Sequence, residues 1–216
     1  RALCGLGLIY EEGRGVPVDL VKAFEYYQQG AQLNDEVCQC NLAFCYEHGI
    51  GVEQDFAQAK YYYELSAQKG YPRALCNLGV MYELGLECQK DEEKALQLYH
   101  QSAKFNYSPA ICNEASCYEN GIGTKVDLSR AFELYLKAAK NQWARAMYHV
   151  GRFYEDGLGI EVDIEKAVQY YELAGQNGIA DGYVEMGRMY EWGILKQSIN
   201  QAIEYYQKAL DMQPPR

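Results

Sequence analysis

The 216-residue sequence lacks the features that several classes of protein require. No apolar run approaches the ~18 residues that a membrane-spanning helix needs. Acidic residues outnumber basic ones by 30 to 20, so the chain does not have the positive charge that nucleic acids and anionic membranes select. No recognised motif places any of the three histidines beside a serine or cysteine nucleophile. We therefore expect no membrane insertion, no nucleic-acid binding and no catalysis.

What the sequence does contain is two columns of residues that recur at intervals of 36. The first consists of Tyr10, Tyr46, Tyr82, Tyr118, Tyr154 and Tyr190. The second consists of Gly13, Gly49, Gly85, Gly121, Gly157 and Gly193. A fixed period of this length, sustained six times, is typical of a stacked repeat array, in which each unit buries apolar surface against its neighbours.

Each 36-residue repeat is predicted to contain two helices. In the first repeat, helix A spans about Ala2 to Glu12, with apolar and small residues at spacings of three, four and seven on one face. Gly13 suits the left-handed residue that ends a helix. Helix B needs an N-cap, and the aspartates at that position are Asp19, Asp55, Asp91, Asp127 and Asp163. Within helix B, an alanine stands four residues before an aromatic residue in every unit.

The pattern Ala-x3-Leu-Gly-x2-Tyr-x2-Gly-x-Gly-Val-x2-Asp-x2-Lys-Ala-x2-Tyr-Tyr resembles the Sel-1-like repeat, a relative of the tetratricopeptide repeat. The resemblance implies an all-α, right-handed superhelical solenoid of six helix-turn-helix repeats, whose A helices line a concave, protein-binding face. We expect one repeat array over residues 1–216, with units near 1–34, 35–70, 71–106, 107–142, 143–178 and 179–213. Because an array needs polar caps and the sequence opens inside a helix pattern, we interpret it as a segment of a longer protein. Glu87 and Lys196 depart from the pattern at the second turn glycine.

The eight cysteines do not have the spacing of a disulfide framework or a metal site. Four of them form a column, Cys4, Cys40, Cys76 and Cys112. Packed helices lie ~8–10 Å apart, whereas a disulfide needs Cα atoms within ~7 Å, so neighbours in this column should not pair. Cys38, Cys40, Cys45 and His48 cannot converge on a zinc ion, because on one helix Cys40 points away from Cys38 and Cys45, and those two lie ~10 Å apart along the axis. We expect free thiols, no metal, no cofactor, and the cytoplasm or another reducing compartment, with the endoplasmic-reticulum lumen left open.

A column of glutamates follows the tyrosine column: Glu11, Glu47, Glu83, Glu119, Glu155 and Glu191. The resemblance places it on the concave side, near the end of helix A. Two interpretations remain open, a solvated column without a ligand and an acidic rail for a basic peptide. The adjoining groove column changes from apolar to basic in the order Leu8, Phe44, Val80, Ser116, Arg152 and Arg188. Because the core columns are committed to packing, ligand choice should reside in this variable column.

We predict a non-catalytic scaffold or adaptor that binds a partner protein or peptide on its concave face. The predicted apolar strip consists of Cys40, Phe44, Cys76, Val80 and Leu84, with Glu47 and Glu83 beside it. The predicted second, anion-tolerant zone consists of Arg145, Arg152 and Arg188. An alternative is a structural spacer that positions catalytic domains elsewhere in a longer chain. A fully polar concave face would favour the spacer, and the apolar strip favours the adaptor.

Overall fold

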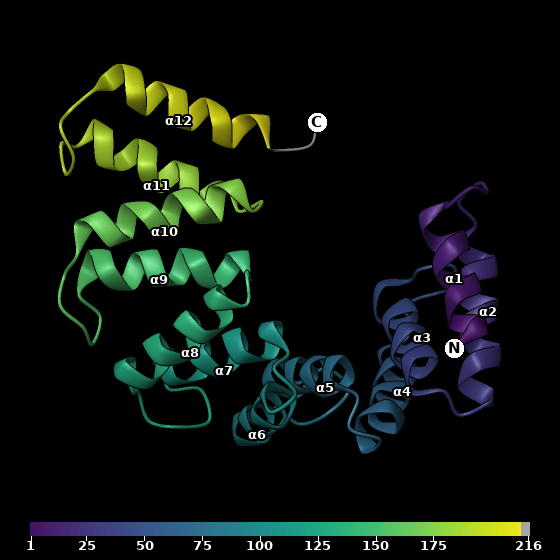
Figure 1. The fold of residues 1–216 in the computed structure, drawn as a ribbon. Helices are drawn as coiled ribbons and strands as arrows, with labels where there is room; N and C mark the ends of the chain where they lie inside the picture. The colour runs from purple at the N-terminus through teal and green to yellow at the C-terminus, as the bar shows by residue number, and fades with distance from the viewer. Residues whose placement is uncertain (213–216) are drawn as a thin grey trace. The chain divides into compact units, whose positions relative to one another are not determined.

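The computed structural model describes residues 1–212, which form twelve α-helices and no strand (Figure 1). The A helices are α1 (Ala2–Glu12), α3 (Glu36–His48), α5 (Pro72–Leu84), α7 (Ser108–Asn120), α9 (Ala144–Asp156) and α11 (Ala180–Glu191). The B helices are α2 (Leu20–Gln32), α4 (Phe56–Gln68), α6 (Glu92–Ala103), α8 (Leu128–Lys140), α10 (Ile164–Gln176) and α12 (Ile199–Asp211). The predicted all-helical fold of six helix pairs is confirmed.

The turns between A and B helices depend on left-handed backbone conformations. The column glycines that follow the A helices all have φ between 66° and 74°: Gly13, Gly49, Gly85, Gly121, Gly157 and Gly193. The second turn glycine of the second repeat, Gly51, is also required by space, because a Cβ there would lie 2.1 Å from the Leu20 carbonyl oxygen. Glu87 replaces this glycine in the third repeat and adopts the same left-handed region at φ 50°. A side chain in that region costs roughly 1 kcal/mol.

The aspartate column caps the first five B helices as predicted. Each carboxylate accepts the backbone N–H three residues further on, at 2.9–3.0 Å, and so satisfies an amide that has no partner within the helix. In α12 the cap is Ser198, whose hydroxyl oxygen accepts the Gln201 N–H at 3.3 Å. The turn of the sixth repeat is one residue shorter, because Ser198 follows Gly193 by five residues where Asp163 follows Gly157 by six, and it keeps the capping interaction with a different residue.

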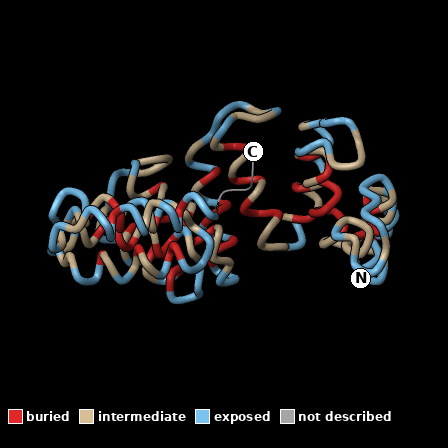
Figure 2. The backbone as a smooth tube through the Cα atoms, turned by 90° about the horizontal axis from the view of Figure 1, so that it is seen from above, coloured by how far each residue is buried: buried red, intermediate tan, exposed pale blue. Residues whose placement is uncertain are grey.

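Buried tyrosines of the B helices form the centre of the core. Five of them are completely inaccessible to solvent: Tyr27, Tyr63, Tyr99, Tyr135 and Tyr171. Their rings lie directly on the small residues of the A helices. A Cβ at Gly7 would lie 2.3 Å from the Tyr27 ring, and one at Gly151 would lie 2.8 Å from the Tyr171 ring. In Figure 2 the buried stretches lie along the inner sides of the helices, and most of the turns are exposed or intermediate.

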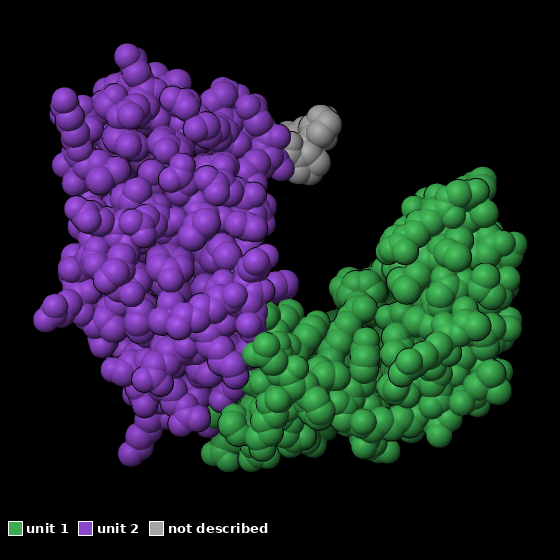
Figure 3. Space-filling model, in the orientation of Figure 1, with its two compact units in different colours: residues 1–110 green, residues 111–216 purple. Residues whose placement is uncertain are grey.

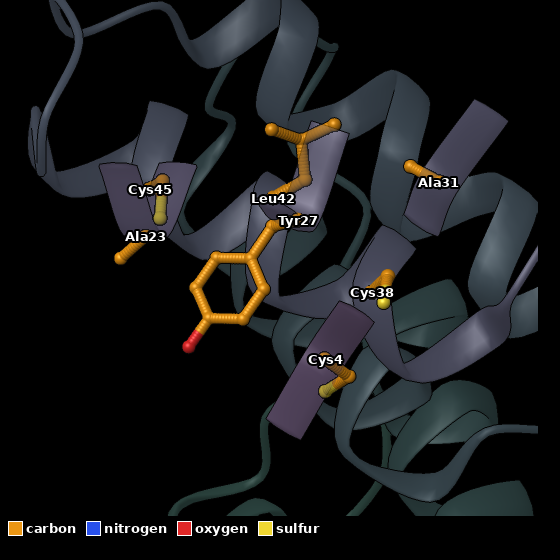
Figure 4. Packing of buried hydrophobic residues seen from close by; sticks show 7 residues of the cluster. All are labelled: Cys4, Ala23, Tyr27, Ala31, Cys38, Leu42 and Cys45. Carbon is orange, nitrogen blue, oxygen red and sulfur yellow. The ribbon is translucent and has the colours of Figure 1, made fainter. Parts of the chain in front are cut away.

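The helices form two compact units, residues 1–110 and 111–216 (Figure 3). In the first unit, Tyr27 packs with Leu42, Ala23 and three cysteines in one apolar cluster (Figure 4). In the second unit, Tyr171 packs with Met186 and Met189 in an equivalent cluster. Each unit therefore contains a core of the same design.

Candidate functional site

Each glutamate of the column accepts a hydrogen bond from the tyrosine of helix B in its own repeat. The pairs are Tyr27–Glu11, Tyr63–Glu47, Tyr99–Glu83, Tyr135–Glu119, Tyr171–Glu155 and Tyr206–Glu191. The last five have oxygen–oxygen distances of 2.6–2.8 Å. Burial, with a further contribution from the carboxylate, raises the pKa of Tyr63, Tyr135 and Tyr171, so these phenols remain donors. The column thus joins helix A to helix B, a role that neither interpretation of the sequence included.

In the second unit, arginines bind the carboxylate oxygens that the tyrosines leave unused. Arg152 forms an ion pair with Glu119, and Arg188 forms one with Glu155. Arg188 also pairs with Glu185 at 2.6 Å. Two of the three arginines of the predicted anion-tolerant zone are therefore neutralised within the fold.

In the first unit, Phe44 and Val80 occupy the groove positions that Arg152 and Arg188 occupy in the second. Within residues 1–212, no lysine or arginine nitrogen lies within 4.0 Å of the carboxylates of Glu11 and Glu47. The closest charged group to Glu47 is the His48 imidazole, with Nδ1 at 3.8 Å. Apolar side chains and uncompensated carboxylates therefore lie together on this face.

A pocket of about 240 Å³ opens on the A-helix face of the first unit. Its lining includes Leu8, Glu11, Tyr27, Asn41, Phe44 and Arg73. The Arg73 guanidinium carbon lies 4.9 Å from the centre of the Phe44 ring, and its Nη1 donates to Asn41 Oδ1 at 3.2 Å. Arg73 was not among the predicted site residues. The sequence could have indicated Arg73, because it occupies the same repeat column as Arg145, a residue of the predicted anion-tolerant zone.

The structure divides the predicted apolar strip by exposure. Phe44 and Val80 are half-buried, and Leu84 is 62% exposed. Cys40 and Cys76 are only 0% and 3% exposed. These two thiols belong to the helix packing and offer no surface of their own, so the accessible strip consists of Phe44, Val80 and Leu84.

All eight cysteines are free thiols in the structure. Cys4 on α1 and Cys38 on α3 lie side by side in the first-unit core (Figure 4). The interaction between the two thiols lowers the pKa of Cys4 and raises the pKa of Cys38. The pair lies outside the 36-residue cysteine column, because Cys38 belongs to a different column of small residues that also contains Ala2 and Ala74.

Residues 1–212 contain no group of three or more histidine, cysteine or acidic side chains placed to hold a metal ion. None of their helices combines the length and apolar character needed to cross a membrane.

Six capped helix pairs around a repeated core define a helical-repeat protein of the solenoid class. The Sel1 repeat model matches residues 1–35, 37–71, 72–104, 108–142, 144–179 and 180–213. The chain therefore belongs to the Sel1 repeat family, and the predicted resemblance is confirmed. Proteins of this family generally act as scaffolds for protein–protein interactions, and the fold is typically non-catalytic.

Several solved structures have a similar fold. A Sel1 repeat protein from Oxalobacter formigenes has a TM-score of 0.89 at 24% identity, covering 96% of this chain and 84% of that one. A protective antigen present in uropathogenic Escherichia coli strains has a TM-score of 0.77 at 26% identity, covering 99% of this chain and 46% of that one. An immunity protein from Pseudomonas aeruginosa has a TM-score of 0.64 at 19% identity, covering 98% and 81%. No curated protein matches the sequence.

Proposed function

We propose that this chain is a non-catalytic scaffold that binds a partner protein or peptide on the A-helix face of its first unit. The contrast between the two units carries the proposal. In the second unit the groove arginines are used in internal ion pairs, whereas the first unit presents Phe44 and Val80 beside carboxylates that have no arginine. Apolar surface next to unpaired charge is what a partner segment would cover.

Phe44 is expected to be the main anchor of this surface. Burying a phenylalanine or valine side chain contributes ~1.5–3 kcal/mol, whereas an exposed ion pair contributes ~0–1 kcal/mol. Phe44 is half-buried in the free protein and already held by the Arg73 guanidinium, so a partner would cover a ring that needs little reordering. Leu84, one turn beyond Val80, extends the same apolar surface.

A photocrosslinking amino acid at the exposed position of Leu84 would capture the partner, and mass spectrometry would identify it. The captured partner is then titrated against Phe44→Ala, which should weaken binding by about 10- to 100-fold. Tyr61→Ala is the matched control, because it removes an exposed ring from helix B of the same unit. If Phe44→Ala binds like the wild type while Lys166→Glu on α10 abolishes binding, the first-unit surface is not the binding site. If the chain is a structural spacer, no partner is captured and neither substitution has a binding effect to measure.

A further inference from the structure

We propose that the pocket beside Arg73 seats the carboxylate of an acidic side chain of the partner. This inference rests on the proposed function, because it names the chemistry of a protein segment bound to the same face. It assigns to Arg73 the recognition of negative charge that the sequence pattern assigned to Arg145, Arg152 and Arg188.

The charge of Arg73 is only partly compensated within residues 1–212. The side chain is half-buried, and none of these residues places a carboxylate within 4.0 Å of its nitrogens. Its contacts are a neutral amide, Asn41, and the face of the Phe44 ring. A guanidinium withdrawn from water without an anion loses hydration that only an opposite charge restores well. Arg73 therefore gives the pocket a positive charge that no ion pair within residues 1–212 uses.

The contacts of Arg73 also fix its orientation. The guanidinium lies over the Phe44 ring, and the Asn41 oxygen takes one of its five N–H groups. The remaining N–H groups keep the fork geometry that matches the two oxygens of a carboxylate. Because this geometry exists before binding, little ordering is required when a carboxylate arrives.

The size and lining of the pocket favour a single acidic side chain over other anions. A volume of about 240 Å³ lies below the roughly 300–1,000 Å³ of sites that enclose whole small molecules. Leu8 and Phe44 provide apolar walls for the methylene groups of an aspartate or glutamate. Glu11 and Glu12 also line the pocket and repel any anion, but they repel a singly charged carboxylate less than a doubly charged phosphate.

Arg145 provides an internal control for this assignment. It occupies the same repeat column as Arg73 but is exposed. At the position equivalent to Phe44, the second unit has Ser116, which offers no ring for a guanidinium to stack on. Arg145 therefore carries the same charge without an aromatic ring at that position to stack on.

The test uses two five-residue peptides, acetyl-Ala-Leu-Glu-Leu-Ala-amide and its glutamine analogue, titrated into the whole protein labelled with nitrogen-15. The Nε–Hε signal of each arginine reports carboxylate binding directly. The glutamate peptide should shift the Arg73 signal saturably, and the glutamine peptide should bind at least about tenfold more weakly. The Arg145 signal should move little with either peptide.

Two variants complete the test. Arg73→Gln should lower the affinity for the glutamate peptide to the affinity measured for the glutamine peptide. Arg145→Gln should leave the affinities for both peptides unchanged. Backbone amide shifts measure the binding in both variants. Equal binding of both peptides, equal shifts at Arg73 and Arg145, or no shift at Arg73 with the glutamate peptide would overturn the proposal. If both peptides bind equally and Phe44→Ala abolishes both, the carboxylate seat is wrong and the first-unit binding surface stands.

Discussion

The imidazole of His149 illustrates how one residue can depart from its repeat column. Its ring stacks on Tyr135, with ring centres 4.4 Å apart and planes within 7°. Its Nδ1 is buried and, among residues 1–212, has no hydrogen-bond partner. Burial, opposed by Glu119 and reinforced by Arg152 and Arg145, lowers the pKa of His149 from 6.5 to about 4. The ring is therefore neutral at pH 7 in the folded protein.

This lowered pKa makes the second unit sensitive to mild acid. The unfolded chain binds a proton as the pH falls through 6.5, whereas the folded chain does so only near pH 4. The free energy of unfolding should therefore fall between pH 6.5 and 4, and His149 should account for about 1–2 kcal/mol of that loss. Three repeats have asparagine in this column, so His149→Asn is the matched variant. Urea unfolding at pH 7 and pH 4.5 should show a smaller fall in the free energy of unfolding for the variant than for the wild type. An equal fall in both proteins would mean that carboxylates, and not His149, cause the acid sensitivity.

The thiols should differ sharply in reactivity. Burial raises the pKa of Cys40, Cys45 and Cys112 to about 12, which leaves almost no thiolate at neutral pH. Cys88 is the one cysteine of the eight that is not buried. An aromatic disulfide reagent should therefore label one thiol rapidly in the native protein and eight after unfolding, and Cys88→Ser should remove the rapid phase. A count of fewer than eight reactive thiols in freshly unfolded protein would contradict the expected reducing compartment. Peptide mapping would then show whether a disulfide links Cys4 and Cys38.

At the scale of the helices, the tyrosine–glutamate hydrogen bonds connect helix B to helix A of the same repeat. The Tyr63 hydroxyl on α4 donates to Glu47 on α3 at 2.6 Å and accepts from the Asn77 amide on α5 at 2.9 Å. One buried oxygen thus links three consecutive helices across a repeat boundary. Hydrogen bonds to charged groups contribute more than neutral ones, about 1.5–3 kcal/mol.

Removing this hydroxyl should destabilise the array without creating a cavity. Tyr63→Phe is expected to lower the free energy of unfolding by about 1–2 kcal/mol, because Glu47 and Asn77 lose a buried partner. Tyr61→Phe on the same helix should change it by less than about 0.5 kcal/mol, because that ring is 54% exposed. Chemical denaturation of both variants measures the difference. Equal effects would show that the Tyr63 bond is replaced by water.

The elements were more predictable from the sequence than the contacts between them. Helix ends follow from local chemistry, such as the Asp91 cap and the left-handed Gly85, which depends on only a few neighbouring residues. The pairing of Arg152 with Glu119 spans 33 residues and depends on how two A helices are placed, which periodicity alone does not specify. Arg73 and Arg145 share a column, yet their exposures differ because one has an aromatic ring beneath it.

For the molecule as a whole, stability should be local, because a repeat array has few contacts between distant units. The core of each unit is built from its own tyrosines and small residues, and the long-range hydrogen bonds of Tyr63 and Tyr171 stay within adjacent repeats. Destabilising one repeat should therefore raise local opening there before it raises global unfolding.

Amide hydrogen exchange of two matched variants tests this locality. Tyr63→Phe should lower protection in α3, α4 and α5 and leave α9 to α11 unchanged, because its hydroxyl contacts only the first unit. Tyr171→Phe should do the reverse, and its effect should be smaller because Arg188 still neutralises Glu155. Mass spectrometry of peptides spanning both units would resolve the two patterns. Equal loss of protection throughout residues 1–212 in either variant would mean that the array opens as one cooperative body, and the local account would be wrong.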